Sequence, residues 1–252
     1  MQQKRLLLFV ALVGLIMAVG TVTSSYAQGQ KATVIAYGDI VTGTITNEAA
    51  EVNYRFTGAE GDVIILQVTR YYGADSSAPT LDEPLLILTD PAGHSTQAEG
   101  YGSAFMALKL PTSGDYGVVV SRADPASVGN FQLALYNPQT LLPSTPVQAT
   151  INNEQTQYYW INSTDELRLS YHRTDGTFSP EITIITPGEF GLNTVGAIYG
   201  SLVAAATLDI RLPSDGLYFV RVAESLYDFN FDPVEAEYTL EVVVRKGLPI
   251  SN

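Results

Sequence analysis

The sequence predicts an all-β protein of two tandem antiparallel β-sandwiches, jelly-roll-like in kind, that follow a signal peptide. The first observation is that apolar and polar residues alternate with a period of two almost throughout, as in Phe131–Leu135 and Tyr238–Val244. The second is that one turn sequence occurs twice, about 100 residues apart. A chain of 252 residues is long enough for two separate cores of that size.

The repeated turn is Leu-Pro-Thr-Ser-Gly-Asp-Tyr at Leu110–Tyr116 and Leu-Pro-Ser-Asp-Gly-Leu-Tyr at Leu212–Tyr218. Proline suits the first turn position because its φ is fixed, and glycine suits a position where φ is positive. Each turn lies between two alternating apolar runs, and we interpret both as β-hairpins. Tyr116 and Tyr218 then begin an inward series, and we expect buried rings whose hydroxyls reach a backbone group of a neighbouring loop.

Matched positions extend outward from the turns without a break in order, which indicates a duplicated domain of about 100 residues. Thr44–Asn47 corresponds to Thr150–Asn153, and Phe131–Leu133 corresponds to Tyr238–Leu240. The predicted boundaries are a signal peptide (1–27), a first sandwich (28–137), a proline-rich linker (138–146), a second, divergent sandwich (147–246) and a tail (247–252). In the second copy, Asn193–Thr207 contains enough Ala and Leu to allow one short helix.

The linker contains three prolines, which restrict its conformations and hold the two sandwiches in a limited range of orientations. Its two apolar residues, Leu141 and Leu142, are candidates for burial in a contact between the copies.

The first 27 residues have the pattern of an export signal. Lys4 and Arg5 precede the apolar run Leu6–Val19, and Ser25–Ala27 supplies the small residues of a cleavage site before Gln28. The alternative is a segment retained as an anchor. The chain has no cysteine, so it lacks disulfides, and export without disulfides favours a bacterial-type secreted, extracellular or cell-envelope protein. No second stretch is long and apolar enough to cross a membrane.

The formal net charge is −13, and removal of Lys4 and Arg5 makes the chain more acidic. Nucleic-acid partners are excluded because phosphate backbones are bound by clustered basic residues, and here the basic residues are scattered. An acidic surface leaves a role open for calcium.

The first repeat resembles the bacterial pre-peptidase C-terminal domain, a β-sandwich module related to bacterial collagen-binding domains. Seven elements occur in the family's order: Gly43–Ile45, Val52–Phe56, Gly61–Ile64, Leu81–Leu85, Thr89–Gly93, Leu110–Tyr116 and Gly129–Leu133. The resemblance implies a non-catalytic binding or accessory module. The second repeat retains the opening strand, Thr186–Gly188 and the turn, but lacks the Gly-Asp-Val and Leu-Asp-Glu-Pro elements. Glu99–Gly102 stands where the family usually has an acidic run. The family's use of calcium is therefore not expected in this chain.

Candidate catalytic groups are few, and we expect no enzyme activity. The histidines are His94, near Asp90 in a turn, and His172, in a strand-like run. Neither has metal-ligand spacing, and the familiar hydrolase patterns are missing. The adjacent acids Asp82 and Glu83 point to opposite faces if they lie on a strand. The alternative is a hydrolase with an unfamiliar site built from loops.

One stretch, Asp228–Pro233, has the spacing of a metal site. Alternation places Asp228, Asn230 and Asp232 on one side, where their oxygens suit a hard cation such as calcium. However, Pro233 stands where a calcium loop has glycine, so the alternative is a hairpin loop whose acids face water. We expect no required cofactor, with calcium as the one candidate.

Exposed aromatic residues are the candidate binding site. Tyr71 and Tyr72 open a long loop of the first repeat, and Tyr101 lies in a glycine-flanked turn, whereas Trp160 lies on a strand and is expected to be packed. Tyrosine rings on loops offer a rigid contact area with a polar tip. The expected partner is an extracellular protein or polysaccharide. A purely structural envelope protein is a further alternative, and the oligomeric state stays open.

Overall fold

The computed structural model describes residues 31–73, 77–152, 155–161, 166–176, 180–188, 191–199, 204–212, 216–223 and 235–245. Every regular element in these ranges is a strand, which confirms the all-β fold. Lys31–Asn252 forms a unit of its own. The predicted signal peptide and tail lie outside the described residues. Within the described ranges, no helix has the length and apolar character needed to cross a membrane.

The described residues of the first copy contain nine strands, and those of the second copy also contain nine. The first copy contains β1 (Thr33–Val34), β2 (Ile40–Ile45), β3 (Val52–Gly58), β4 (Val63–Arg70), β5 (Pro84–Thr89), β6 (Ser95–Glu99), β7 (Ser103–Lys109), β8 (Gly114–Arg122) and β9 (Gly129–Tyr136). The second contains β10 (Gln139–Thr140), β11 (Val147–Asn152), β12 (Thr156–Ile161), β13 (Glu166–Gly176), β14 (Glu181–Gly188), β15 (Gly191–Ile198), β16 (Ala205–Arg211), β17 (Tyr218–Ala223) and β18 (Glu235–Val244).

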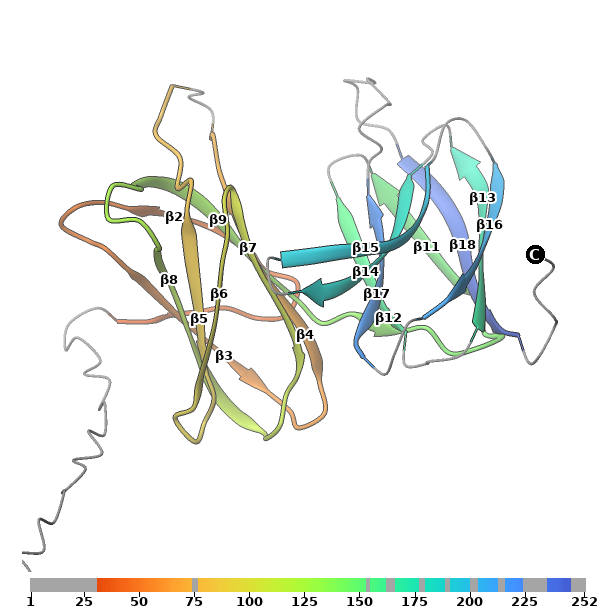
Figure 1. Ribbon diagram of the computed structural model, residues 1–252, viewed down its shortest axis with the longest axis horizontal. Helices are drawn as coiled ribbons and strands as arrows, with labels where there is room; N and C mark the ends of the chain where they lie inside the picture. Colours follow the sequence, from red (N-terminus) through yellow and green to blue (C-terminus); the bar gives the residue numbers. More distant parts are fainter. Residues whose placement is uncertain are drawn as a thin grey trace, which may run out of the picture. The chain divides into compact units, whose positions relative to one another are not determined.

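The two copies have the same topology (Figure 1). In the first copy, one sheet has the order β1-β3-β8-β5-β6 and the other β2-β9-β4-β7; in the second, the orders are β10-β12-β17-β14-β15 and β11-β18-β13-β16. Each strand of the first copy therefore has a counterpart in the second. The parallel strand pair of the described residues also recurs, because β1 pairs with β3 and β10 with β12 in parallel. The shared topology supports a duplicated domain.

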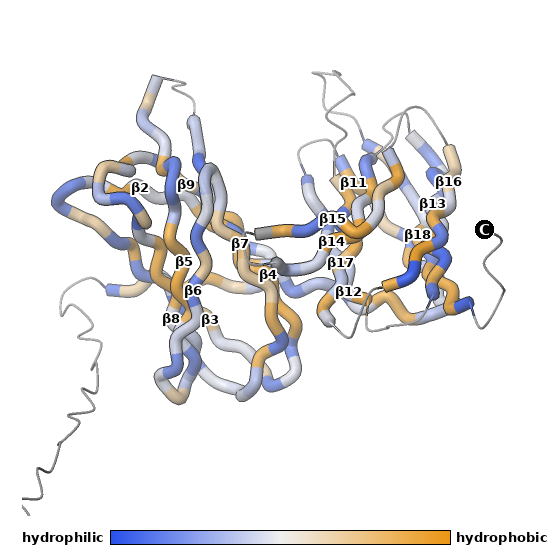
Figure 2. The backbone as a smooth tube through the Cα atoms, viewed as in Figure 1, coloured by the Kyte–Doolittle hydropathy of each residue, from blue (hydrophilic) through white to orange (hydrophobic). Residues whose placement is uncertain are grey.

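The alternating sequence accounts for both sandwiches. Side chains of one parity along each strand point into the space between the two sheets of a copy, where they form one apolar cluster per copy. Figure 2 shows hydrophobic stretches along β4 and β7. Burying one such side chain stabilises the fold by roughly 1.5–3 kcal/mol. The largest fully buried side chains include Phe56, Tyr116, Phe131, Phe219 and Tyr238.

The interpretation of the repeated turns as β-hairpins is wrong. β7 and β8, which flank the first turn, belong to different sheets, and so do β16 and β17 in the second copy. Each turn is an arch that carries the chain from one sheet to the other. The two flanking strands lie in opposite sheets and do not pair through backbone hydrogen bonds. A true hairpin of the first copy is instead formed by β5 and β6, which are consecutive strands and pair with each other.

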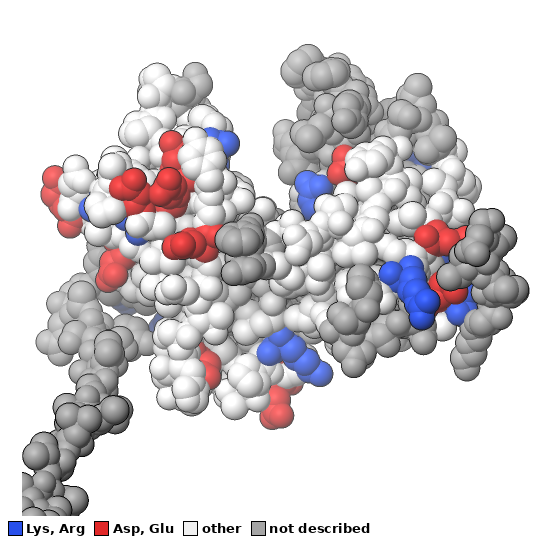
Figure 3. Space-filling model, in the orientation of Figure 1, with Lys and Arg blue, Asp and Glu red and all other residues white. Residues whose placement is uncertain are grey.

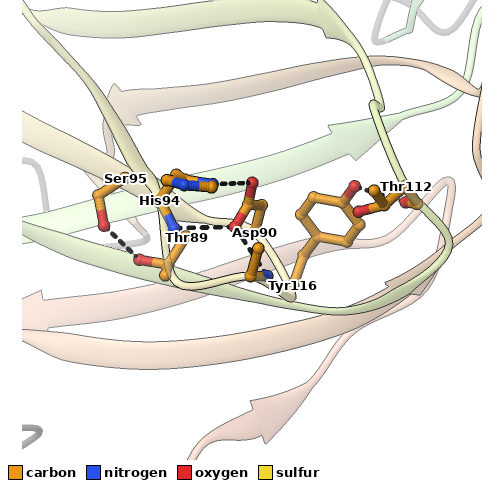
Figure 4. A network of polar contacts seen from close by, with 7 residues as sticks. Thr89, Asp90, His94, Ser95, Thr112 and Tyr116 are labelled. Carbon is orange, nitrogen blue, oxygen red and sulfur yellow. Dashed lines mark hydrogen bonds and ion pairs between the residues drawn. The ribbon is translucent and has the colours of Figure 1, made fainter.

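The predicted burial of the arch tyrosines is confirmed. Tyr116 and Tyr218 are only 1% and 3% exposed, and the ring of Tyr116 stacks on Phe56 with centroids 5.3 Å apart. Figure 4 shows the Tyr116 hydroxyl donating to the carbonyl oxygen of Thr112, at 2.6 Å. This acceptor lies in the arch itself and not in a neighbouring loop, so the hydroxyl fastens its own turn. The turn residues 213–215 of the second copy lie outside the described residues.

The helix allowed by Asn193–Thr207 does not form. Residues 191–198 are β15, paired with β14, and residues 205–211 are β16, paired with β13. In this region helix propensity is overridden by strand pairing, because Val195 and Leu208 pack against the core of the second sandwich.

The segment between the copies is partly built into the second sandwich. Gln139 and Thr140, within the predicted linker, form β10 beside β12. Leu141 is 2% exposed and its backbone N–H donates to the carbonyl of Trp160 at 2.8 Å, whereas Leu142 is 57% exposed. Leu141 therefore belongs to the core of the second copy.

A third apolar cluster contains residues of both copies. Its buried members are Val63, Ile65 and Phe105 of the first copy with Tyr158, Ile185 and Phe219 of the second. The first three lie on the outer face of sheet β2-β9-β4-β7, the face that points away from its own core. We call this contact the junction. Tyr136 and Tyr158 meet edge to face there at 4.9 Å, and the Tyr158 hydroxyl donates to Gln67 at 3.3 Å.

Candidate functional site

The predicted aromatic residues lie at the end of the first sandwich where β4 ends and β7 begins. Tyr71, Tyr72 and Tyr101 are 38%, 49% and 74% exposed. The backbone N–H of Tyr71 donates to Asn130 at 3.2 Å, so the chain after β4 still runs beside β9. The backbone N–H of Arg70 donates to Gly102 at 3.1 Å. This bond joins the segment of Tyr71 to that of Tyr101, although the two are 30 positions apart in the sequence.

Arg70 organises this end of the sandwich. Its guanidinium carbon lies 5.6 Å from the centre of the Tyr101 ring, and its Nη1 lies 3.8 Å from Oδ1 of Asp82. The Gly102 backbone N–H donates to the Asp82 carbonyl at 2.6 Å, with φ at +76°. A Cβ on Gly102 would lie 3.2 Å from the guanidinium, so glycine leaves room for the arginine. The arrangement positions the Tyr101 ring while leaving it exposed to solvent.

The candidate acid pair has structural roles instead of facing one site. Asp82 also accepts a hydrogen bond from the Thr80 hydroxyl at 2.9 Å. The Glu83 backbone accepts from Ala123 at 2.8 Å, and its N–H donates to Ser127 at 3.0 Å. These contacts connect the strand entry of β5 to the loop after β8.

His94 and Asp90 form the β5–β6 turn (Figure 4). Asp90 Oδ1 accepts from the backbone N–H groups of Ala92 and His94 at 2.9 and 2.8 Å, and Oδ2 lies 3.0 Å from Nδ1 of His94. Burial opposes ionisation of Asp90, but the hydrogen bonds from His94 and Ala92 outweigh it and lower its pKa. The neighbouring Ser95 hydroxyl lies 2.9 Å from that of Thr89. Asp90 and His94 therefore stabilise the turn. The Ser95 hydroxyl is paired with Thr89 and not with His94.

The calcium candidates Asp228, Asn230 and Asp232 lie outside the described residues. Within the described part of the chain, no group of three or more His, Cys, Asp or Glu side chains is placed to hold a metal ion. Trp160 packs against the junction, with Lys109 Nζ 6.0 Å from its ring centre.

The structure also contains a groove that the sequence did not indicate. Two adjoining cavities of about 430 and 440 Å³ lie where the first copy meets β12, and they share Gly38, Tyr136, Thr156 and Gln157. We call the two together the junction groove. Its other lining residues are Tyr37, Ile40, Gln67, Thr69, Gln132, Ala134, Asn137, Pro138, Gln139, Ala149, Gln155, Tyr158 and Tyr159. None of the lining residues is charged.

Gln157 is the fixed point of the junction groove. Its Nε2 donates to the Thr150 carbonyl at 2.7 Å, and its Oε1 accepts from Tyr159 at 3.2 Å and from Tyr238. The hydroxyls of Tyr159 and Tyr238 are 2.7 Å apart. Burial, then the neighbouring Tyr159, raise the pKa of Tyr238, so this network is neutral across the physiological range. Thr150, Gln157 and Tyr159 are close in the sequence, whereas Tyr238 on β18 is about 80 positions away and is brought to them by the topology.

No protein-family profile matches the chain, and no curated protein matches it. Among solved structures, it is similar to the pre-peptidase C-terminal domain of a collagenase from Bacillus anthracis, at 17% identity and a TM-score of 0.35, over 43% of this chain and 97% of that domain. It is also similar to the tandem CBM22 modules of Xyn10C from Paenibacillus barcinonensis, at 8% identity and a TM-score of 0.27, over 84% of this chain and 99% of that one.

A third similar structure is PNGase F, a glycosylasparaginase from Flavobacterium meningosepticum, at 7% identity and a TM-score of 0.22, over 82% of this chain and 98% of that one. These similarities assign no function. The β-sandwich fold of the chain rests on its own strand pairing.

Proposed function

We propose that this protein is a secreted or envelope-associated, non-catalytic tandem β-sandwich that binds a protein or polysaccharide surface. The observation that carries the proposal is the 74% exposed ring of Tyr101, held by Arg70 beside the segment of Tyr71 and Tyr72. A large exposed ring that is already positioned loses little conformational freedom when a ligand covers it. Aromatic anchors of this kind dominate the binding energy of many interfaces.

The order of elements in the first copy supports its assignment as a tandem pre-peptidase C-terminal type module. Thr89–Gly93, one of the elements of the resemblance, forms the β5–β6 turn, and Leu110–Tyr116 forms the arch between β7 and β8. The second copy repeats the topology although it lacks several of those elements. On this proposal the second copy is a divergent member of the same type.

Export is part of the proposal and has its own test. N-terminal sequencing of the protein recovered from the medium or envelope of an expressing bacterium should find Gln28 as the first residue. Recovery of a form that begins at Met1 with the apolar run intact would contradict cleavage and favour an anchor.

Binding is tested by co-sedimentation with insoluble polysaccharides (cellulose, chitin and xylan) and by capture on immobilised gelatin. Tyr72→Ala and Tyr101→Ala should each weaken binding to the captured surface about 5- to 10-fold, since loss of an anchor ring costs more than about 1 kcal/mol. The matched control is Tyr199→Ala, which removes a 62% exposed ring from the second copy and should leave binding unchanged. If the three substitutions have equal effects, or if none of them alters binding, Tyr72 and Tyr101 are not the binding residues.

A further inference from the structure

The junction groove is uncharged in a chain where charged residues make up 15% of the sequence and acids outnumber bases two to one. Two other cavities of the described residues show the contrast: one is lined by Glu60 and Lys109, and another by Glu237. The junction groove therefore differs from these two cavities in having no charged residue in its lining. An uncharged lining of amides, hydroxyls and tyrosine rings suits an uncharged, hydroxyl-rich ligand.

Several amides of the groove have hydrogen-bonding capacity left for a ligand. Among the described residues, Gln132 and Gln139 make no side-chain hydrogen bond. Gln67 and Gln155 use only their oxygens, which accept from Tyr158 and from the backbone N–H of Asn152. The NH₂ groups of all four amides are thus unused. Each amide can donate and accept, which matches the hydroxyl group of a sugar, itself both donor and acceptor.

The groove continues along the outer face of sheet β2-β9-β4-β7. Strand register places Thr42 opposite Gln132, Gln132 opposite Thr69, and Thr69 opposite Ser103. The four residues form one row across all four strands of the sheet. A second row, next to the junction, contains Ile40, Ala134, Gln67 and Phe105. We call these two rows the neutral face; neither contains a charged residue.

We propose that the junction groove and the neutral face bind a neutral polysaccharide chain. The row from Thr42 to Ser103 presents hydroxyl and amide groups at the spacing of neighbouring strands, about 4.8 Å, so an extended chain can contact several in succession. Half-exposed apolar surface at Ile40, which is 54% exposed, packs against the flat side of a sugar ring. An acidic polysaccharide is disfavoured because neither row of the neutral face contains a basic residue and the protein is strongly acidic.

This inference rests on the proposed binding function and deepens it, because it names a ligand class and a second part of the surface. The two can fail separately. Tyr101→Ala tests the exposed tyrosines at the end of the first sandwich. Changes at Gln132 test the neutral face.

The experiment measures binding by calorimetry and affinity electrophoresis. The ligands are three neutral oligosaccharides (cellohexaose, xylohexaose and mannohexaose), one acidic oligosaccharide (hexagalacturonate) and gelatin. Gln132→Glu should weaken binding of a neutral oligosaccharide at least 10-fold, and Gln132→Ala about 3- to 10-fold, with unchanged melting temperatures. The matched control is Thr239→Glu, since Thr239 holds the equivalent position opposite Gln148 and His172 in the second copy. It should have no effect on binding.

Binding of a neutral oligosaccharide that is lost in Gln132→Glu and retained in Thr239→Glu supports the inference. It is overturned if no neutral oligosaccharide binds, if only hexagalacturonate or gelatin binds, or if the two glutamate variants act alike. If glycan binding responds to Tyr101→Ala alone, the neutral-face inference falls while the proposed function stands. If no surface or oligosaccharide binds at all, both fail.

Discussion

The two copies share a topology but differ in the chemistry of one sheet face. In the first copy, the row Tyr136–Ile65–Ala107 crosses the outer face of sheet β2-β9-β4-β7 and is covered at the junction. The same row of the second copy is Val243–Arg168–Asp209. Arg168 donates twice to Asp209, at 2.7 Å each, and Arg245 lies 3.2 Å from it. Figure 3 shows basic and acidic side chains side by side on the second copy.

The comparison teaches that strand order and face chemistry are set independently. The inward residues of both copies keep the same apolar alternation, so the same sandwich forms twice. The outward residues decide whether a face is covered or meets water. The hydrogen bonds from Arg168 lower the pKa of Asp209, which keeps the carboxylate ionised and the face hydrated.

The largest effect on the contact between the two copies is expected when the charged row of the second copy is transferred to the first. Ile65→Arg removes a fully buried side chain and places an unpaired charge in the junction, at a cost of about 4 kcal/mol. The charge can reach water only if the junction opens, so calorimetry should show two melting transitions. Thr69→Arg, on the same strand and face but outside the junction cluster, is the control and should shift stability by about 0.5 kcal/mol or less. A single unchanged transition for Ile65→Arg would contradict the assignment of the junction.

The shared interior should respond alike in both copies. Tyr116→Ala and Tyr218→Ala should each cost about 3–5 kcal/mol, because each removes a buried ring and leaves a cavity. Tyr116→Phe removes only the bond to Thr112 and should cost about 1 kcal/mol. Tyr71→Ala, on the exposed loop, should stay within about 0.5 kcal/mol. Chemical denaturation measures all four, and unfolding by Tyr71→Ala with no change in Tyr218→Ala would reverse our assignment of inside and outside.

Alkaline pH should weaken the junction. Burial raises the pKa of Tyr158 to about 12, with Arg221 opposing the shift. A raised tyrosine pKa means that the folded state holds the proton more tightly, so its contribution is complete below the unfolded pKa of about 10 and is lost as pH rises towards 12. The loss is about 2–3 kcal/mol for this residue. Melting temperatures between pH 8 and 12 should fall less steeply in Tyr158→Phe; an identical fall would show that Tyr158 is not a buried titrating group.

The smallest effect on stability should come from the reverse transfer. Arg168→Ile breaks a surface ion pair, whose loss costs at most about 1 kcal/mol. However, it makes the face resemble the covered one, so sedimentation velocity should detect concentration-dependent self-association. Arg55→Ile, an exposed change on the other sheet of the first copy, is the control and should stay monodisperse. If both variants are monodisperse, the ion pairs of Asp209 are not what prevents this face from self-associating.

The sequence was sufficient for the fold class and for the inward residues. Alternation in a strand predicts which side chains share a face, and it correctly placed Tyr116 and Tyr218 in the cores. It does not predict which strands pair with each other in a sheet. Two runs in opposite sheets alternate in the same way as two runs that pair within one sheet, so the arch at Leu110–Tyr116 was interpreted as a hairpin. The helix expected near Asn193 failed because local propensity is weaker than packing.

Sequence reasoning found the aromatic candidates but not the groove. Tyr71, Tyr72 and Tyr101 are exposed as loop residues of this type commonly are, whereas Arg70, which positions Tyr101, was missed because their contact depends on the pairing of β4 with β7. Gln132 and Gln67 looked like ordinary outward residues. A usable signal was present, since the outward positions of β2, β4 and β9 carry no charged residue, whereas those of β18 include Glu235, Glu237 and Glu241.

The arches also determine when each sandwich can be completed as the chain is made. Both sheets of the first copy have a late strand at an interior position: β8 lies between β3 and β5, and β9 lies between β2 and β4. The sheet β1-β3-β8-β5-β6 therefore cannot close until Arg122 is available, and the sheet β2-β9-β4-β7 cannot close until Tyr136 is available, although β2 begins nearly 100 residues earlier. Such non-local pairing slows folding to the millisecond-to-second range typical of sandwiches. Until β9 is available, β2 has no partner strand and β4 pairs with β7 alone, so one of the two sheets stays incomplete after the other has all its strands.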